Sequence, residues 1–132
     1  MKRILFLCVE NSCRSQIAEG FARKLADKRV EVYSAGSKPS GEINPMAVQV
    51  MAEIGIDISE RDSKSVLDLP VRDFDYLITL GCKDSCPIAQ AKEHIEWKIE
   101  DPKGRGMEFF RKVRDDIEFR VKELLCKISA EN

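Results

Sequence analysis

A thiol and an arginine flank a short loop immediately after the first apolar run of the chain. Residues 4–7 are apolar and few, as expected for a buried parallel strand. The segment from Cys8 to Ser15 reads CVENSCRS, and residues 16–28 are typical of a helix. A strand, a tight loop and a helix in this order direct backbone N–H groups and the positive end of the helix dipole into the loop. The sequence therefore predicts an α/β fold with an oxyanion-binding loop after its first strand.

Three side chains of this loop suit a site for a tetrahedral dianion. Cys8 is the candidate nucleophile, and a helix N-terminus favours the reactive thiolate form. The planar guanidinium of Arg14 can hold two oxygens, and the Ser15 hydroxyl can donate a hydrogen bond to the thiolate. The alternative is a buried cysteine that ends a strand beside a surface arginine. That interpretation leaves the coincidence of nucleophile, cation and helix start unexplained.

The other loop residues complete the predicted substrate-binding set, which comprises Glu10, Asn11, Ser12 and Cys13 as well as Arg14 and Ser15. Asn11 tolerates the left-handed backbone that an anion nest requires. Cys13 either packs inside the loop, its expected routine role, or forms a protective disulfide with Cys8. The Glu10 carboxylate is unfavourable beside a dianion unless it points to solvent.

Composition restricts the class of protein. With 132 residues and 43% hydrophobic content, the chain fits a single domain over residues 1–132. A net charge of −1 indicates no bulk attraction to nucleic acid or membranes. We find neither a long apolar run nor a signal peptide, and we expect a monomeric cytoplasmic protein. In that reducing compartment, cysteines 8, 13, 82, 86 and 126 favour catalytic, redox or metal-binding roles over structural disulfides.

Strand and helix patterns alternate along the chain. Strands are predicted over residues 3–7, 30–34, 76–80 and 95–99, and helices over 16–28, 44–55 and 106–128. Asn44 is a candidate helix N-cap, with Pro45 at the first helical position. The alternation predicts a four-stranded parallel sheet with helices on both faces. Ligands bind such sheets beyond the carboxyl ends of the strands, where the Cys8 loop, residues 81–82 and residues 100–102 fall.

Cys82 and Cys86 form a second thiol cluster after the third predicted strand. With His94 as the only histidine, the chain offers too few ligands for a metal site here, and we predict none. The polar residues around the pair argue against two small buried hydrophobes. The remaining interpretation is a dithiol that passes electrons to Cys8. Hydrolysis of a phosphate ester on cysteine needs one thiolate, whereas two-electron reduction of an oxyanion needs a second thiol.

Asp101 is the candidate general acid or base. Pro102 biases it towards an extended backbone, which can direct its carboxylate over the loop. The alternative is a turn-forming Asp-Pro, the commoner role of this dipeptide. Glu100 is a neighbouring candidate for the acid.

Several short motifs together carry a family resemblance. They are Cys8-x₅-Arg14-Ser15, Ser34-Ala35-Gly36, Asn44-Pro45, the stretch 55–59, Ser63-Lys64 and Asp101-Pro102. Over almost its whole length the chain resembles the arsenate reductases of the low-molecular-weight protein tyrosine phosphatase superfamily. Residues 11–16 and 55–59 favour the reductase branch. A phosphatase of this family usually carries aromatic residues before the Asp-Pro, in the region that Cys82 and Cys86 begin here.

The resemblance implies an oxidoreductase that serves arsenic detoxification. Cys8 would attack arsenate, with Arg14 and the loop amides on its oxygens and Asp101 protonating the departing one. Cys82 would then attack Cys8 and release arsenite, and Cys86 would attack Cys82. The resulting redox-active Cys82–Cys86 disulfide would be reduced by thioredoxin, with no bound cofactor.

Two alternatives accompany this expectation. The spacer between Cys82 and Cys86 has only three residues, shorter than in well-known thioredoxin-coupled members, so glutaredoxin with glutathione is a second candidate donor. The alternative activity is hydrolysis of phosphomonoesters through a Cys8 phosphoenzyme, and weak phosphatase activity is compatible with reduction. A non-catalytic oxyanion-binding regulator would not need the intact nucleophile, arginine and acid.

Overall fold

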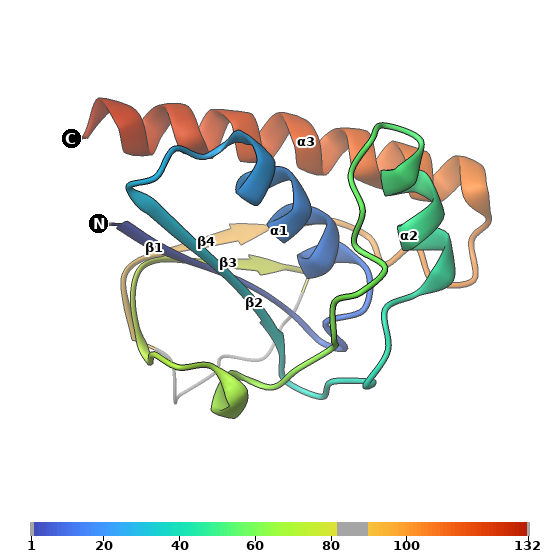
Figure 1. Ribbon diagram of the computed structural model, residues 1–132, viewed down its shortest axis with the longest axis horizontal. Helices are drawn as coiled ribbons and strands as arrows, with labels where there is room; N and C mark the ends of the chain where they lie inside the picture. Colours follow the sequence, from blue (N-terminus) through green and yellow to red (C-terminus); the bar gives the residue numbers. More distant parts are fainter. Residues whose placement is uncertain (1, 82–89, 132) are drawn as a thin grey trace.

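The computed structural model describes residues 2–81 and 90–131, and contains a four-stranded sheet in the order β2-β1-β3-β4 (Figure 1). The strands are β1 (Lys2–Cys8), β2 (Val30–Gly36), β3 (Asp73–Leu80) and β4 (Gln90–Trp97). The helices are α1 (Arg14–Leu25), α2 (Pro45–Ala52), the 3₁₀ helix η1 (Val66–Asp68) and α3 (Met107–Ala130). All three strand pairings are parallel, which confirms the sheet predicted from the alternating pattern.

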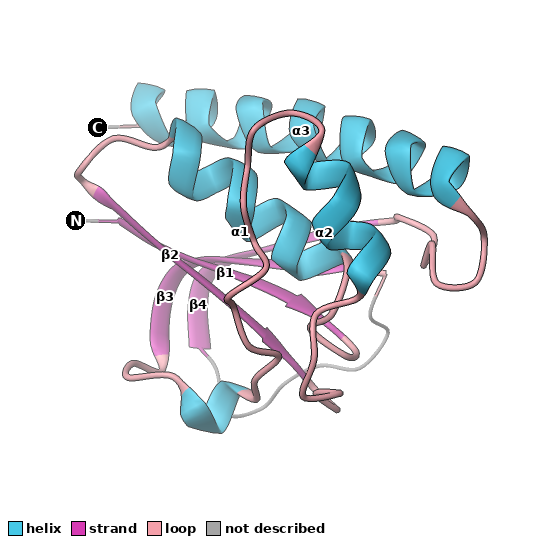
Figure 2. Cartoon of the chain, turned by 45° about the vertical axis from the view of Figure 1, so that its right-hand side comes forward, coloured by secondary structure: helices cyan, strands magenta, loops and turns pink. Residues whose placement is uncertain are grey.

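The three α-helices cover one face of the sheet, and η1 lies on the other (Figures 1 and 2). Side chains of β1 alternate between the two faces. Phe6 and Cys8 join the larger core beneath the α-helices, whereas Leu5 and Leu7 pack with Val66 of η1 in a smaller cluster. Helices therefore lie on both faces, as predicted, although the second face carries only η1 in the described part of the chain. Cys8 lies at the end of the larger core.

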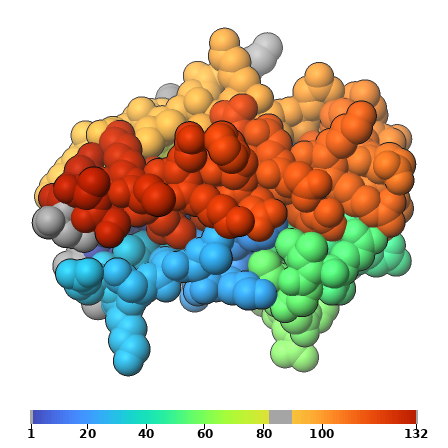
Figure 3. All heavy atoms as spheres, turned by 90° about the horizontal axis from the view of Figure 1, so that it is seen from above, coloured from blue at the N-terminus to red at the C-terminus, as the bar shows by residue number. Residues whose placement is uncertain are grey.

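α3 is the longest helix and crosses the molecule above α1 and α2 (Figure 3). Its buried residues follow a helical repeat and are Phe110, Val113, Ile117, Val121, Leu124 and Ile128. Full burial of each large apolar side chain contributes about 1.5–3 kcal/mol, so this stripe is a major part of the core. Within residues 2–81 and 90–131, no helix has both the length and the apolar character to cross a membrane.

Several predicted boundaries differ from the structure by two residues or more, and two differences have a clear physical cause. α1 ends at Leu25, three residues before the predicted end, because Ala26 is extended and the Asp27 carboxylate accepts from the Arg29 N–H in a turn before β2. The fourth strand spans Gln90–Trp97 instead of 95–99. This strand pairs with β3 from Asp73↔Gln90 to Leu80↔Trp97 at the sheet edge, where polar side chains on both faces obscure the apolar signal.

Candidate functional site

The loop between β1 and α1 places the predicted nucleophile and the predicted cation at the ends of two elements. Cys8 is the last residue of β1, and Arg14 is the first residue of α1. The N-terminus of α1 has no side-chain cap and no acidic residue in its first turn. Its first N–H groups and the positive end of its dipole are thus available to an anion.

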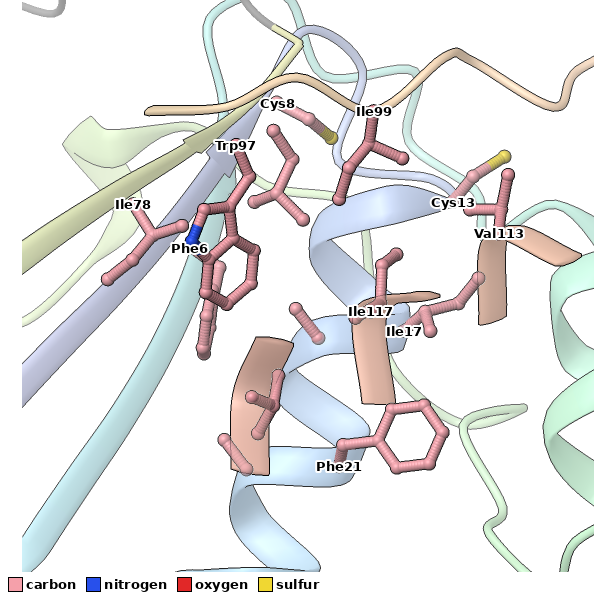
Figure 4. Close-up of a cluster of buried hydrophobic side chains, with 14 of the residues drawn as sticks. Phe6, Cys8, Cys13, Ile17, Phe21, Ile78, Trp97, Ile99, Val113 and Ile117 are labelled. Atoms are coloured by element: carbon pink, nitrogen blue, oxygen red, sulfur yellow. The ribbon is translucent and has the colours of Figure 1, made fainter. Parts of the chain in front are cut away.

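The Cys8 thiol is buried beside the hydroxyl predicted to assist it. Its Sγ lies 2.9 Å from Ser15 Oγ, and the residue is 2% exposed. Figure 4 shows Cys8 at the end of the core, next to Ile99 and beyond Trp97. An adjacent hydroxyl donor stabilises a thiolate more than a thiol, so the contact suits the role predicted for Ser15.

Asn11 holds the loop together from inside. Its φ is 52°, the left-handed conformation that the sequence predicted. Its side-chain amide donates to Ser15 Oγ at 2.7 Å and to Ser34 Oγ at 3.1 Å. Its side-chain oxygen accepts from the Lys64 N–H at 2.9 Å and from the Gln16 side chain at 3.0 Å. The fully buried amide therefore connects the loop to α1, β2 and the segment before η1.

The loop backbone is also fixed from outside. The carbonyl oxygens of Cys8, Val9, Glu10 and Ser12 accept hydrogen bonds from N–H groups of residues 37–44, at 2.8–3.2 Å. Because residues 37–44 satisfy these carbonyl oxygens, the loop can keep the oxygens directed towards that segment. These bonds suit a loop whose N–H groups must bind an anion without reorganising.

A buried acidic residue next to this network was missed by the sequence analysis. Glu19 of α1 is 3% exposed and accepts a hydrogen bond from the Ser34 hydroxyl. Arg23 Nε donates to it at 2.6 Å, and Arg61 and Lys64 lie at 3.6 and 4.0 Å. Burial lowers the pKa of Arg61 and Lys64, an effect that Glu19 opposes. The only sequence signal was the i,i+4 spacing of Glu19 and Arg23, which usually marks an exposed helix face.

Arg14 is oriented by the chain that follows β4. It is 6% exposed, and its guanidinium donates to the Ile99 carbonyl at 3.0 Å. Gly81 makes this packing possible, since a Cβ there would lie 2.1 Å from the guanidinium and 2.5 Å from Ile99 O. The second guanidinium nitrogen lies 3.8 Å from the Asp101 carboxylate. The structure therefore brings Arg14 and Asp101 together.

The surroundings of Asp101 fit both interpretations that the sequence left open, a turn-forming residue and a general acid or base. Its carboxylate accepts from the Lys103 N–H at 3.0 Å, as in a turn, while its other oxygen faces Arg14. The side chain is 47% exposed, so solvent reaches it. Glu100, the neighbouring candidate, pairs with Arg105 at 3.2 Å instead.

The remaining predicted residues have different surroundings. Glu10 pairs with Lys103 through both carboxylate oxygens, at 2.9 and 3.0 Å. Burial raises the pKa of Cys13 to about 12, which keeps this residue a thiol and favours the packing role. Cys82 and Cys86 lie outside the described residues. Among residues 2–81 and 90–131, no group of three potential metal ligands forms.

The larger cavities on the surface do not coincide with the predicted site residues. Hollows of about 730 and 430 Å³ lie against α3 and are lined by none of the predicted site residues. A smaller cavity of about 190 Å³ borders the loop, between Glu10, Ser12, Asn44 and Lys103. An oxyanion is small and charged, so it needs the loop's donors more than a large apolar volume.

The sheet order and the loop define an α/β protein that presents a cysteine and an arginine at the start of a helix. Residues 3–132 match the low molecular weight phosphotyrosine protein phosphatase family, and the chain belongs to that family. A relative from Synechocystis, named glutaredoxin arsenate reductase, is 41% identical over 132 residues, which covers 98% of this chain and all of that protein.

Solved structures agree with this assignment. An arsenate reductase in its phosphate-binding state is 40% identical and superimposes with a TM-score of 0.87, covering 97% of this chain and 99% of that one. A thioredoxin-dependent arsenate reductase from Corynebacterium glutamicum is 36% identical, with a TM-score of 0.84 over the whole of this chain and 64% of that one.

Proposed function

We propose that this protein reduces arsenate to arsenite through a thiol relay that runs from Cys8 to Cys82 to Cys86. The observation that carries the first step of this proposal is the Cys8–Ser15 contact beside the uncapped start of α1, with Arg14 at its first position. That arrangement supplies a nucleophile, an anion site and a cation within one loop. Arsenate reductases at about 40% identity over nearly the full chain support the choice of oxyanion.

The first step forms a bond between Cys8 sulfur and arsenic. Arg14 and the loop N–H groups hold the arsenate oxygens, and the Cys8 thiolate displaces one oxygen. Asp101 gives that oxygen a proton, so that it leaves as water. The position of Asp101 beside Arg14 supports this role, because both groups then face the same anion.

The next steps move two electrons to arsenic. Cys82 attacks Cys8 sulfur, the sulfur–arsenic bond breaks, and its electron pair stays on arsenic, which departs as arsenite. Cys86 then attacks Cys82 in the Cys8–Cys82 disulfide and frees the Cys8 thiol. Thioredoxin reduces the final Cys82–Cys86 disulfide. Glutaredoxin with glutathione is the alternative donor, in line with the name of the Synechocystis relative.

A phosphatase activity at the same loop is the second candidate. The family is named for phosphotyrosine phosphatases, and the solved relative in its phosphate-binding state shows that a closely similar fold accepts this anion. Hydrolysis needs Cys8, Arg14 and Asp101 but neither Cys82 nor Cys86. We expect it to be weak beside arsenate reduction.

The test is NADPH oxidation on addition of arsenate, with thioredoxin and thioredoxin reductase, repeated with glutaredoxin, glutathione and glutathione reductase. We expect turnover in the wild type and none in Cys82→Ser or Cys86→Ser. Cys126→Ser is the matched control, because Cys126 is an exposed thiol on α3 outside the relay. Full arsenate turnover in Cys82→Ser would refute the relay, and hydrolysis of p-nitrophenyl phosphate without arsenate turnover would establish the phosphatase.

The setting of this activity follows from the same chemistry. A relay that must be re-reduced after each cycle requires a reducing compartment, which supports the cytoplasm. We also propose a single domain over residues 1–132, since every described strand joins one sheet. We propose that the protein is a monomer, which size-exclusion chromatography would test.

A further inference from the structure

The Glu10 carboxylate lies in the middle of the anion-binding loop, where its negative charge is unfavourable. A carboxylate two residues after the nucleophile repels the dianion that the loop must bind. Its backbone carbonyl is fixed by the Ser63 hydroxyl at 2.6 Å and by the Ser40 N–H at 3.1 Å, so residue 10 cannot simply move away. The carboxylate therefore needs either contact with solvent or a neutralising group beside it.

Lys103 provides that group and comes from a distant part of the chain. Its ammonium lies 2.9 and 3.0 Å from the two Glu10 oxygens, across 93 residues of sequence. The Glu10 carboxylate raises the pKa of Lys103, which keeps the ammonium charged. The pair is thus a direct contact between the anion-binding loop and the segment that precedes α3.

The backbone of Lys103 contacts the candidate acid. Its N–H donates to Asp101 Oδ1 at 3.0 Å, and the other carboxylate oxygen faces Arg14 at 3.8 Å. Glu10, Lys103 and Asp101 therefore form a continuous chain of contacts from the loop to the carboxylate that faces Arg14. The segment carrying Ile99 passes beside Cys8 in Figure 4, so a shift of this segment changes what lies over the thiol.

We propose that Glu10 and Lys103 are positioning residues, whose ion pair holds residues 101–103 against the loop so that the Asp101 carboxyl faces the departing oxygen. This inference rests on the proposed function, because it assigns the pair a role in the same acid-assisted step. This role does not require either side chain to contact the oxyanion. Their effect on the reaction passes through the orientation of Asp101.

The test compares single variants with a matched control in the arsenate assay. Glu10→Gln and Lys103→Gln should each lower kcat by up to about fivefold, since loss of the ion pair frees Asp101 to turn away from the departing oxygen, and KM for arsenate should not rise. The charge-reversed double variant Glu10→Lys with Lys103→Glu should regain most of the lost kcat. Arg105→Gln is the control, because it removes a charge from the same segment but breaks the Arg105–Glu100 pair and the stacking of Arg105 on Phe109, neither of which involves Asp101.

A double-mutant cycle separates positioning from a merely structural role. If the pair acts through Asp101, Glu10→Gln should have no further effect on kcat in the Asp101→Asn background. The same fivefold loss in both backgrounds, an equal loss in Arg105→Gln, or a higher KM with unchanged kcat would each overturn the proposal.

Failure of the proposed function gives a different result. If the wild type does not reduce arsenate but hydrolyses p-nitrophenyl phosphate, the same variants are compared in that reaction, in which Asp101 protonates the leaving oxygen. The cycle then still decides whether Glu10 and Lys103 position Asp101. A wild type that performs neither reaction overturns both the proposed function and this role for the pair.

Discussion

Gly36 offers a sharp test of how the loop is held, because a single methyl group there would collide with its backbone. Gly36 ends β2 and pairs with Cys8 at the end of β1. A Cβ on residue 36 would lie 2.6 Å from Val9 O, 2.9 Å from Asn11 N and 3.0 Å from the Glu10 carbonyl carbon. All three are main-chain atoms, so no side-chain rotation relieves the contact.

The size of the effect follows from these distances. Ordinary contacts of a Cβ begin at 3.4 Å, so Gly36→Ala must displace the loop by about 0.8 Å. Overpacking of this kind costs about 1–3 kcal/mol of unfolding free energy. A displacement approaching 1 Å at a preorganised site can cost about 100-fold in rate, so we expect kcat/KM to fall by about 10- to 100-fold.

The assay combines urea denaturation with arsenate turnover. Trp97 is the only tryptophan and is 7% exposed, so its fluorescence reports unfolding. Gly55→Ala is the control, because its φ of +81° strains an alanine while a Cβ there meets no atom within 4 Å. The control should lose about 1 kcal/mol of stability and keep its activity. Wild-type kcat/KM in Gly36→Ala, at wild-type stability, would refute the claim that close packing of β2 fixes the loop.

Three further outcomes are expected. Ser15→Ala should slow alkylation of Cys8 by iodoacetamide at neutral pH by about tenfold, because the thiolate loses a hydrogen bond of about 1.5 kcal/mol; an unchanged rate contradicts a donor role. Burial raises the pKa of Cys13 from 9.0 to about 12, so the folded protein retains a proton that the unfolded chain releases above pH 9. In urea denaturation, stability should therefore fall with rising pH above 9 by about 1.4 kcal/mol per pH unit more than in Cys13→Ala, and parallel profiles would contradict this. Glu19→Gln should lower the unfolding free energy by about 3 kcal/mol, since Arg61 and the neighbouring cations lose their buried partner; a loss below about 0.5 kcal/mol in urea would contradict it.

Local patterns were sufficient to predict most of the sheet. β1, β2 and β3 carry compact apolar or β-branched runs because they pack in the core, and α3 keeps one apolar stripe along its length. Although β2, the other edge strand, is mostly buried, β4 was misplaced because both of its faces are exposed or partly exposed. Its sequence, QAKEHIEW, therefore lacks the apolar run by which the other strands were recognised.

The anion-binding loop could be predicted from the sequence, but the buried polar residues around it could not. Its functional groups are contiguous in sequence, so their spacing alone suggested an anion site. Glu19, Ser34 and Lys64 belong to three separate segments that only the folded chain brings together. Each is of a type that is usually exposed. The burial of Glu19 and Ser34 and the partial burial of Lys64 depend on tertiary partners that no local pattern reveals.

Loop geometry by itself does not choose between the two reactions open to this family. Attack by the Cys8 thiolate on phosphorus and on arsenic requires the same N–H groups and the same arginine. The reactions diverge at the next step, when the adduct on Cys8 is attacked. Water at phosphorus regenerates the thiolate without redox change, whereas a thiol at sulfur leaves an electron pair on arsenic and a disulfide on the protein. Reduction therefore depends on where the second and third thiols lie in the chain, and Cys82 and Cys86 are the residues on which the assignment of reductase rests.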